Sequence, residues 1–373
     1  MADCRTERFI WHPAARVFDR DGMVGSLAAG AAVIDDRPAG RALALALARG
    51  DGFRIGAGDQ PFDAVPGEFE VLTGGSLGVP KRVARRVGSW QASFTVNAGL
   101  FGIGPGTCVT VPGRLCHSLP LYAALEAVHL GADVHLLDAV RADRAAHRMA
   151  QVGAEVVYAT PTQMRQMQGV RWPALRHIVL GGERVDAHLR AALARAAPAA
   201  VITEFYGAAE TSFITMTDAD TPEGSVGRAC PGVEIDLRDG VIWVRSPYLA
   251  QGTDWMTVGE MGRLEAGYLF LHGRAGRMVT IAGQNVFPEH IEHWMMGLPG
   301  IARVAVLAVA DPARGHVLEA WVQGDAARAG DILVAARGQF GAVLAPRRLH
   351  WMVQWPELPS GKTDLGALQR ALT

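Results

Sequence analysis

The chain has 373 residues, of which 36 are Lys or Arg and 37 are Asp or Glu, so its formal net charge is −1. This balance argues against a nucleic-acid-binding protein or a polybasic membrane-surface protein, because both usually carry a basic excess. The length predicts two or three domains, and apolar residues at 49% with charged residues at 20% are typical of a folded globular chain.

The predicted elements begin with a helix over residues 40–50, in an Ala- and Gly-rich region that becomes irregular up to residue 66. Residues 69–73 predict a short strand, which runs into a glycine-rich turn and then a helix over 89–100. From residue 108 onward, apolar strand-like runs alternate with helical runs. The strand-like runs cover residues 108–113, 132–138, 155–160, 177–183 and 201–207. This alternation is typical of α/β layers around a largely parallel sheet.

After residue 222 the pattern changes to short strands separated by turns, at 233–246 and 267–277, which predicts a small β-rich subdomain. From Met278 a further module combines strands and helices in a different order. Its strands are predicted at 302–311, 316–324 and 349–354, and its helices at 288–297, 331–344 and from 364. We therefore expect an α/β protein with a large domain over 1–275, built of mostly parallel α/β layers plus the β-rich subdomain. A small α+β domain should cover 276–373.

Targeting signals and disulfides are not expected. Asp3, Arg5 and Glu7 stand where a signal peptide needs apolar residues, and Glu126 interrupts the most apolar stretch, so none reaches the roughly 18 residues of a membrane span. The four cysteines form no CxxC pair and no cluster with metal-ligand spacing, which indicates reduced thiols. We expect a cytoplasmic protein that binds neither membranes nor nucleic acid.

Lysine is rare in this chain, since 34 of the 36 basic residues are Arg and only Lys81 and Lys362 are Lys. Positions that accept either residue would follow this bias toward Arg, so a remaining Lys is a candidate for a site that needs an ammonium group. Lys81 ends the run 73–81, whose glycines can turn backbone N–H groups toward an anion. The run lacks the spacing of a Walker A loop, and in isolation an ordinary turn explains it better. In isolation, Lys362 in the turn 358–364 also indicates a solvated loop.

Further Gly-containing polar clusters follow strand ends, where ligands bind in parallel α/β sheets; they lie at 181–183, 205–211, 259–262 and 273–274. Together and in this order, the motifs resemble those of the adenylate-forming superfamily, which comprises acyl- and aryl-CoA ligases, luciferases and the adenylation domains of peptide synthetases. The resemblance runs from about residue 69 to the C-terminus. It rests on a phosphate loop (TGGSLGVPKRV, 73–83), a Tyr-Gly-x-Thr-Glu-like motif (FYGAAETS, 205–212), the long run 257–292 and a catalytic-lysine loop (LPSGKTDLGAL, 358–368).

The resemblance implies a role for each matching residue. The nucleotide-binding residues would be Thr73, Gly74, Gly75, Ser76, Gly78 and Lys81 at the phosphates, Gly182, Glu183 and Tyr206 around adenine with Gly207 in the same motif, Glu260 and Arg274 at the ribose, and Gly283 in the segment after the hinge. Glu210 would hold Mg²⁺, and Lys362 would bridge the carboxylate and the α-phosphate during adenylation. His117 would lie at a gate beside the acid pocket, although a half-buried structural His explains it nearly as well.

We predict an ATP- and Mg²⁺-dependent ligase that forms an acyl-adenylate from a small carboxylic acid and passes the acyl group to CoA. Two alternatives stay open: transfer to the pantetheine arm of a carrier protein, and a non-catalytic nucleotide-binding relative. The residues expected to line the acid pocket, which aryl and medium-chain acyl groups would fit equally, are Leu119, Tyr122, Val179, Phe205 and Phe213. The sequence leaves the oligomeric state open.

The chain departs from the family pattern at several positions. Its region before the phosphate loop is shorter than usual, Ala209 stands where a Thr commonly contacts the adenylate, and Glu260 replaces the usual Asp. At the hinge, Gly276 and Arg277 replace an acidic pair. Because Gly has the widest range of backbone conformations, this replacement predicts a looser pivot for a mobile small domain.

Overall fold

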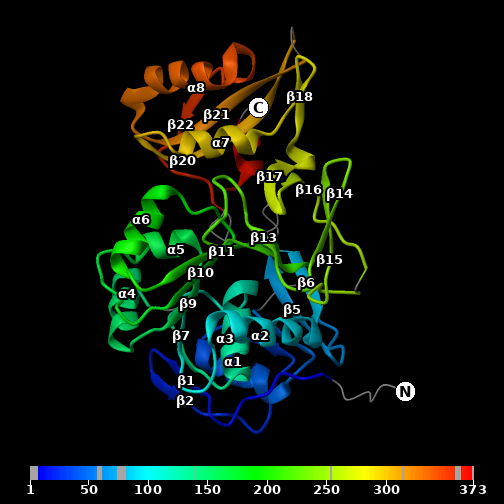
Figure 1. Cartoon of the computed structure of the whole chain (residues 1–373), viewed down its shortest axis with the longest axis vertical. Helices are drawn as coiled ribbons and strands as arrows, with labels where there is room; N and C mark the ends of the chain where they lie inside the picture. The colour runs from blue at the N-terminus through cyan, green and yellow to red at the C-terminus, as the bar shows by residue number, and fades with distance from the viewer. Residues whose placement is uncertain are drawn as a thin grey trace.

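The structure of the chain is a computed structural model that describes residues 7–56, 61–73, 81–138, 140–252, 254–312, 315–357 and 363–371. Elements up to residue 274 form a larger body, and the elements from residue 279 onward lie together at its upper end (Figure 1). None of the described helices combines the length and the apolar composition that crossing a bilayer requires.

A parallel sheet with helices between its strands forms the centre of the larger body, as the sequence predicts. The parallel strands are β7 (Cys108–Val111), β8 (Asp133–Leu136), β9 (Val156–Ala159), β10 (His177–Gly181) and β11 (Val201–Ala208). The helices that precede or connect them are α2 (Val87–Phe101), α3 (Ser118–His129), α4 (Ala142–Gln151), α5 (Pro161–Gln166) and α6 (Ala187–Ala196). All residues of β7, β8 and β9 are buried, which is typical of a parallel sheet covered on both faces.

The N-terminal region contributes strands that the sequence pattern does not predict. β1 (Arg16–Asp19) pairs in parallel with β8, and β2 (Gly22–Val24) pairs with β1. A separate four-stranded sheet contains β3 (Val33–Ile34), β4 (Phe53–Ile55), β5 (Glu68–Thr73) and β6 (Lys81–Arg86). Helix α1 (Ala39–Arg49) and strand β5 match the predicted elements. β6 lies where only a turn leading to a helix is predicted, and it pairs antiparallel with β5.

The predicted β-rich subdomain continues the central sheet. Its strands are β12 (Ser212–Met216), β13 (Arg228–Ala229), β14 (Glu234–Arg238), β15 (Val241–Arg245), β16 (Glu260–Glu265) and β17 (Tyr268–Arg274). They extend the sheet to thirteen strands in the order β14-β15-β16-β17-β13-β12-β11-β10-β9-β7-β8-β1-β2. In this order only β12 and β13 separate β11 from β17, which pairs with β16. Residues of β11, β16 and β17 that are distant in sequence can therefore come together at one edge of the sheet.

The C-terminal elements follow the short 3₁₀ helix Ala275–Arg277. They are the hairpin β18 (Val279–Ile281) and β19 (Gln284–Val286), α7 (Pro288–Met296), β20 (Ile301–Asp311), β21 (Gly315–Gly324), a 3₁₀ turn (Ala326–Arg328), α8 (Ala329–Leu344), β22 (Leu349–Trp351) and α9 (Leu365–Arg370). The apolar clusters around Leu318 and Trp321 contain, among the described residues, only positions from 279 onward. A division into domains 1–275 and 276–373 stays a prediction.

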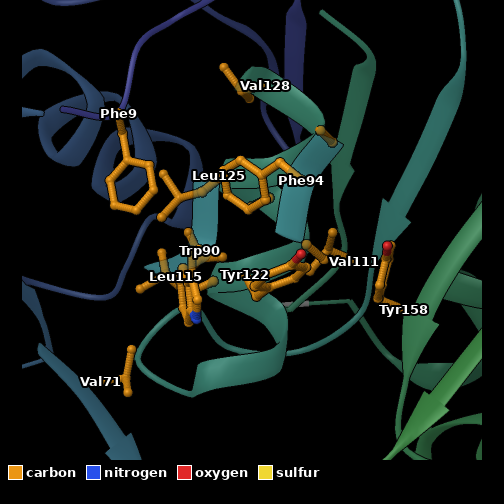
Figure 2. Close-up of a cluster of buried hydrophobic side chains, with 14 of the residues drawn as sticks. Phe9, Val71, Trp90, Phe94, Val111, Leu115, Tyr122, Leu125, Val128 and Tyr158 are labelled. Atoms are coloured by element: carbon orange, nitrogen blue, oxygen red, sulfur yellow. The ribbon is translucent and has the colours of Figure 1, made fainter. Parts of the chain in front are cut away.

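Helices α2 and α3 pack together in the centre of the larger body, where Tyr122 lies beside Trp90 and Phe94 (Figure 2). The ring of Tyr122 meets those of Trp90 and Phe94 edge to face, with centroids 5.1 and 5.3 Å apart. Such aromatic contacts add stability beyond the area that they bury. The contacts with Trp90 and Phe94 fix the part of α3 around Tyr122 in the core.

Three cysteines are buried free thiols, as the sequence predicts, and they are Cys108, Cys116 and Cys230. Burial raises the pKa of the Cys108 thiol to about 11, so it stays protonated at neutral pH. Cys4 lies outside the described residues.

Candidate active site

A cavity of about 350 Å³, here called the strand-end pocket, opens at the carboxyl ends of β9, β10 and β11. The residues predicted for the site that line it are Thr73, His117, Gly182, Glu183 and Gly207. Ligands in parallel α/β folds bind at this end of the strands. Segments spread over more than a hundred residues of sequence therefore meet at one cavity.

The apolar wall of the strand-end pocket matches the prediction with one exception. Leu119, Tyr122, Phe205 and Phe213 line the cavity. Val179 does not line it, because the side chain lies inside β10, in the buried core. Val179 lies two residues before Gly181 and therefore on the same face of β10, but it is farther from the carboxyl end of the strand, where Gly181 and Phe205 line the cavity.

A second and larger cavity of about 860 Å³ lies between β17 and α7, and we call it the β17–α7 cleft. Glu260 and Arg274 line it from the paired strands β16 and β17, whereas Glu289 and His290 line it from α7. Thr363 also lines the cleft. The cleft therefore brings the C-terminal elements against the edge of the central sheet.

Tyr206, Glu260 and Arg274 form a connected group at this edge. Glu260 and Arg274 are paired across β16 and β17, and the Arg274 Nε lies 3.7 Å from Glu260 Oε1. The hydroxyl of Tyr206 donates a hydrogen bond to Glu260 Oε2. Burial and then the negative charge of Glu260 raise the pKa of Tyr206, so its hydroxyl remains a donor. Three residues predicted for nucleotide binding thus come together through β11, β16 and β17.

Two glycines shape the rim of the strand-end pocket by allowing close approach. A Cβ on Gly181 would lie 2.1 Å from the ring of Phe205, and a Cβ on Gly207 would lie 1.9 Å from the main-chain oxygen of Ser212. A register shift between Tyr206 and Gly207 accompanies the second contact. Glycine is therefore required at both positions for the close packing of β10, β11 and β12.

Glu183 and Gly182 lie exposed at the end of β10. Thr162 at the start of α5 donates a hydrogen bond of 2.7 Å to Glu183 Oε2. Gly182 has a φ of +87°, which favours glycine, and a Cβ there would meet nothing closer than 4.0 Å. This open surface leaves space for a flat group beside the strand-end pocket.

Glu210 lies in the turn between β11 and β12, which is held in place by a residue that the sequence reading missed. Arg85 of β6 is fully buried and donates to the main-chain oxygen of Ala209, and also to that of Tyr248 at 2.6 Å. It donates further to Ser89 Oγ at 3.2 Å. Burial lowers the pKa of Arg85 to about 9, so it remains charged at neutral pH. Arg85 therefore ties the strand after the glycine-rich run to the turn that carries Glu210.

The remaining predicted residues fall into two groups, those outside the described part of the chain and one described residue away from the cavities. Gly74, Gly75, Ser76, Gly78 and Lys362 lie outside the described residues, as does the side chain of Lys81. Gly283 lies in the exposed turn of the β18–β19 hairpin and lines neither described cavity. Beside Lys362, the described Thr363 pairs with Glu357 and accepts a hydrogen bond of 3.1 Å from Trp355 Nε1.

Arg277 is bonded to the C-terminal elements. The expectation that Gly276 and Arg277, in place of an acidic pair, loosen the pivot is therefore wrong for Arg277. Its guanidinium donates to Glu292 of α7 at 2.7 and 3.1 Å and lies 3.2 Å from Glu289. It also donates to the main-chain oxygen of Val306 in β20 at 2.8 Å. A bidentate pair between Arg and a carboxylate fixes geometry as well as distance. Of the two replaced residues, only Gly276 adds freedom.

A buried carboxyl group lies behind the strand-end pocket, at Glu126 of α3. It is 0% exposed, and it accepts hydrogen bonds from Asn97 Nδ2 at 3.0 Å, from the Tyr122 hydroxyl at 2.9 Å and from the Tyr158 hydroxyl at 2.5 Å. Burial raises the pKa of Glu126 to about 7, although these hydrogen bonds oppose the shift. In the sequence, Glu126 is evident only as a polar interruption of an apolar stretch, and the one signal of its role is that it follows Tyr122 by four residues on a predicted helix.

The raised pKa of Glu126 predicts a pH-dependent stability. Below its ordinary value of 4.5 the carboxyl is protonated in both the folded and the unfolded chain, so it adds no pH dependence. As pH rises toward about 7, the folded chain retains the proton longer, and stability falls by about 3 kcal/mol in total. We expect Glu126→Gln to remove most of this loss, measured by chemical denaturation at several pH values between about 5 and 8.5.

Glu265→Gln provides the matched control, because Glu265 is an exposed glutamate of β16 with a side chain 64% accessible. That variant should keep the pH dependence of the parent chain. An equal decline of stability with pH in the parent and in Glu126→Gln would contradict the assignment.

The sequence is similar to those of known enzymes. Residues 70–252 match the family described as AMP-binding enzyme. YhfT of Bacillus subtilis, named an uncharacterized acyl–CoA ligase, is 30% identical over 316 residues, which are 78% of this chain and 66% of YhfT. Indoleacetate–CoA ligase of Aromatoleum aromaticum is 26% identical over 357 residues, covering 80% of this chain and 68% of that enzyme. The chain spans only 55 to 58% of the length of several further relatives.

The fold is similar to that of a solved structure over almost its whole length. The amide bond synthetase McbA from Marinactinospora thermotolerans matches with a TM-score of 0.80 at 22% identity, covering 96% of both chains. At this identity the match concerns the fold alone.

Proposed function

We propose, because this chain belongs to the adenylate-forming superfamily of AMP-binding enzymes, that it is an AMP-forming carboxylate ligase. It converts a carboxylic acid and ATP to an acyl-adenylate and pyrophosphate, and it then transfers the acyl group to CoA. The observation that carries this proposal is that Phe205 and Gly207 of β11 line the strand-end pocket, while Tyr206 between them is bonded to Glu260, which pairs with Arg274 at the β17–α7 cleft.

The connected group supports nucleotide binding through its donors and acceptors. Glu260 offers carboxylate oxygens that accept hydrogen bonds from ribose hydroxyls, and Arg274 offers N–H donors beside them. The hydrogen bond of the Tyr206 hydroxyl to Glu260 fixes its ring beside the predicted ribose-binding pair, and an aromatic ring at this place is suited to stacking on a base. The open space above Gly182 accommodates a flat ring. The residues present therefore fit a nucleoside.

Charge at the phosphates is the main barrier to the reaction, because a carboxylate must attack a polyanion. Glu210 supplies a carboxylate ligand for Mg²⁺, which neutralises phosphate charge when it is bound. Lys362 supplies a second positive charge at the carboxylate and the α-phosphate. Its described neighbour Thr363 lines the same cleft as Glu260 and Arg274, which supports this role. His117 lines the strand-end pocket beside Thr73, in a position to border the incoming acid.

The acyl acceptor is CoA in the favoured proposal, because YhfT and the indoleacetate enzyme are both named as CoA ligases. An amine is tested as a further acceptor because McbA, a solved structure with the same fold, is named an amide bond synthetase, although the shared fold does not itself assign an acceptor. Reactions with CoA, with a panel of amines and with a phosphopantetheinylated carrier protein separate these acceptors. Mass spectrometry would show a CoA thioester, an amide or a loaded carrier.

Carboxylate-dependent exchange of pyrophosphate into ATP tests the adenylation step. Exchange should occur with Mg²⁺ and a suitable acid and should stop when the acid is omitted. Arg274→Ala should raise the apparent KM for ATP by about tenfold or more, because it removes a charged donor at the ribose. Arg238→Ala, which changes an exposed arginine paired with Asp236, should leave that KM unchanged. Absence of exchange across a broad panel of acids would favour a non-catalytic relative.

A further inference from the structure

Tyr122 closes the inner end of the strand-end pocket. It lines the cavity although only 2% of its surface is exposed. Its ring lies edge to face against Phe213, with centroids 4.9 Å apart, and against Trp90, with centroids 5.1 Å apart. Both neighbours also line the cavity, so the floor and the adjoining walls are aromatic.

Hydrogen bonds fix the position of this floor. The Tyr122 hydroxyl lies 2.7 Å from Ser93 Oγ, accepts from Asn97 Nδ2 at 3.0 Å and donates to Glu126 at 2.9 Å. Ser93, Asn97 and Glu126 are each 2% exposed or less. Swinging Tyr122 away would remove one buried hydrogen bond from each of Ser93, Asn97 and Glu126 and would leave the Tyr122 hydroxyl without these partners, which is costly in a protein interior. The ring is therefore a fixed wall and not a gate.

The space in front of Tyr122 favours a flat and short group. Phe205 and Phe213 face each other edge to face with centroids 4.7 Å apart, and together with Leu119 they form the side of the pocket. Aromatic rings are well packed by such edge-to-face contacts. The cavity of about 350 Å³ must also hold the reacting carboxyl near Gly182 and Gly207, which shortens the part left for the acid.

Described residues fill the region behind Tyr122, and they leave a long chain no continuation there. Tyr158 and Glu126 occupy it, and they are 1% and 0% exposed. Figure 2 shows Tyr122 between Trp90 and Tyr158 in this packed core. A long alkyl group would have to displace the hydrogen-bonded network in order to extend past the ring.

We propose, on the basis of the ligase function above, that the substrate is a compact aryl acid and that Tyr122 is the specificity-determining residue that excludes long alkyl acids. The ring of the acid packs against Phe205, Phe213 and Tyr122, with its carboxylate directed toward the glycine-lined rim of the strand-end pocket. Of the two classes that the sequence alone fits equally, aryl and medium-chain acyl groups, the proposal selects the aryl class, and octanoate represents the other class in the test.

The test compares kcat/KM for acid-dependent pyrophosphate release with benzoate, naphthoate, octanoate and dodecanoate. We expect a preference of at least about tenfold for an aryl acid over both alkyl acids. Tyr122→Ala should shift the ratio of dodecanoate to aryl acid upward by about tenfold or more, because it opens the floor. Tyr122→Phe keeps the ring and should keep the preference.

Binding gives a second measurement that does not depend on turnover or on a variant that folds poorly. Benzoyl and dodecanoyl sulfamoyl-adenosine, which are stable analogues of the acyl-adenylate, should be compared by calorimetry on the unmodified chain. Tighter binding of the benzoyl compound supports the proposal. Equal or better binding and turnover of the dodecanoyl group would overturn it while leaving the ligase function intact. Failure of both analogues to bind and of all acids to react would refute the ligase function itself.

Discussion

Replacing Lys362 by alanine should lower acid-dependent ATP–pyrophosphate exchange by about 10²–10³-fold, the usual effect of removing one preorganised donor from a charged transition state. ATP binding measured by calorimetry should be largely retained, because the ammonium is needed when negative charge builds up between the carboxylate and the α-phosphate. The segment after Lys362 is anchored at the β17–α7 cleft through Thr363, whose hydroxyl is bound by Trp355.

Lys362→Arg is the informative companion of that variant. Arg keeps the positive charge but carries a planar fork of donors in place of a compact ammonium, so we expect it to restore little exchange. Unchanged exchange in Lys362→Ala would refute the role assigned to this residue. Loss of ATP binding together with exchange would instead indicate a role in holding the nucleotide.

Replacing Arg85 by alanine should lower the free energy of unfolding by about 3 kcal/mol, because two buried main-chain acceptors lose their donor at roughly 1–3 kcal/mol each. The acceptors are the oxygens of Ala209 and Tyr248, and the lost guanidinium also leaves the face of Trp90, 5.4 Å from its centroid. Part of the loss is offset because the variant no longer buries a charge. Chemical denaturation measures the difference directly.

Arg141→Ala is the matched control for Arg85→Ala. Arg141 has a side chain 77% exposed and pairs with the exposed Asp143, so its removal should change stability by less than about 1 kcal/mol. The Arg85 variant should also show weaker Mg²⁺-dependent exchange, because the turn that carries Glu210 loses its anchor. A stability equal to that of the parent chain would show that this guanidinium is not holding the turn.

Much of the fold could be predicted from local pattern, because strands such as β7 and β9 are short runs of mostly apolar residues and helices such as α4 and α6 have a regular amphipathic period. β1 could not be predicted this way, since it is a four-residue strand whose partner β8 lies more than a hundred residues away. In β6 the buried positions alternate with more exposed ones, and Val83 and Arg85 are buried. Because one of these buried residues is an arginine, the sequence of β6 does not show the alternation of apolar and polar residues that predicts a strand.

The candidate site was predictable to the extent that short motifs mark it. Tyr206, Glu260 and Arg274 belong to recognisable segments, and the structure brings them into contact. Arg85 and Glu126 carry no motif, because their importance comes from burial among partners on other elements, which only the three-dimensional arrangement reveals. Val179 shows the converse case, since a plausible apolar residue on the same face of its strand as the site can lie too deep in the core to reach the cavity.

The contacts of Arg277 place the connection between the central sheet and the C-terminal elements at the short 3₁₀ helix Ala275–Arg277. The main-chain N–H of Ala275 is bound to Gly259, and Arg274 is paired with Glu260, so both travel with the central sheet. Arg277 is bound to α7 and β20 and travels with the C-terminal elements. Gly276 lies between these groups, in a turn closed by hydrogen bonds from the Met278 N–H to the main-chain oxygens of Arg274 and Ala275, and a Cβ on Gly276 would meet nothing within 4 Å. A substitution at Gly276 would therefore change the stiffness of this turn without altering the lining of either described cavity.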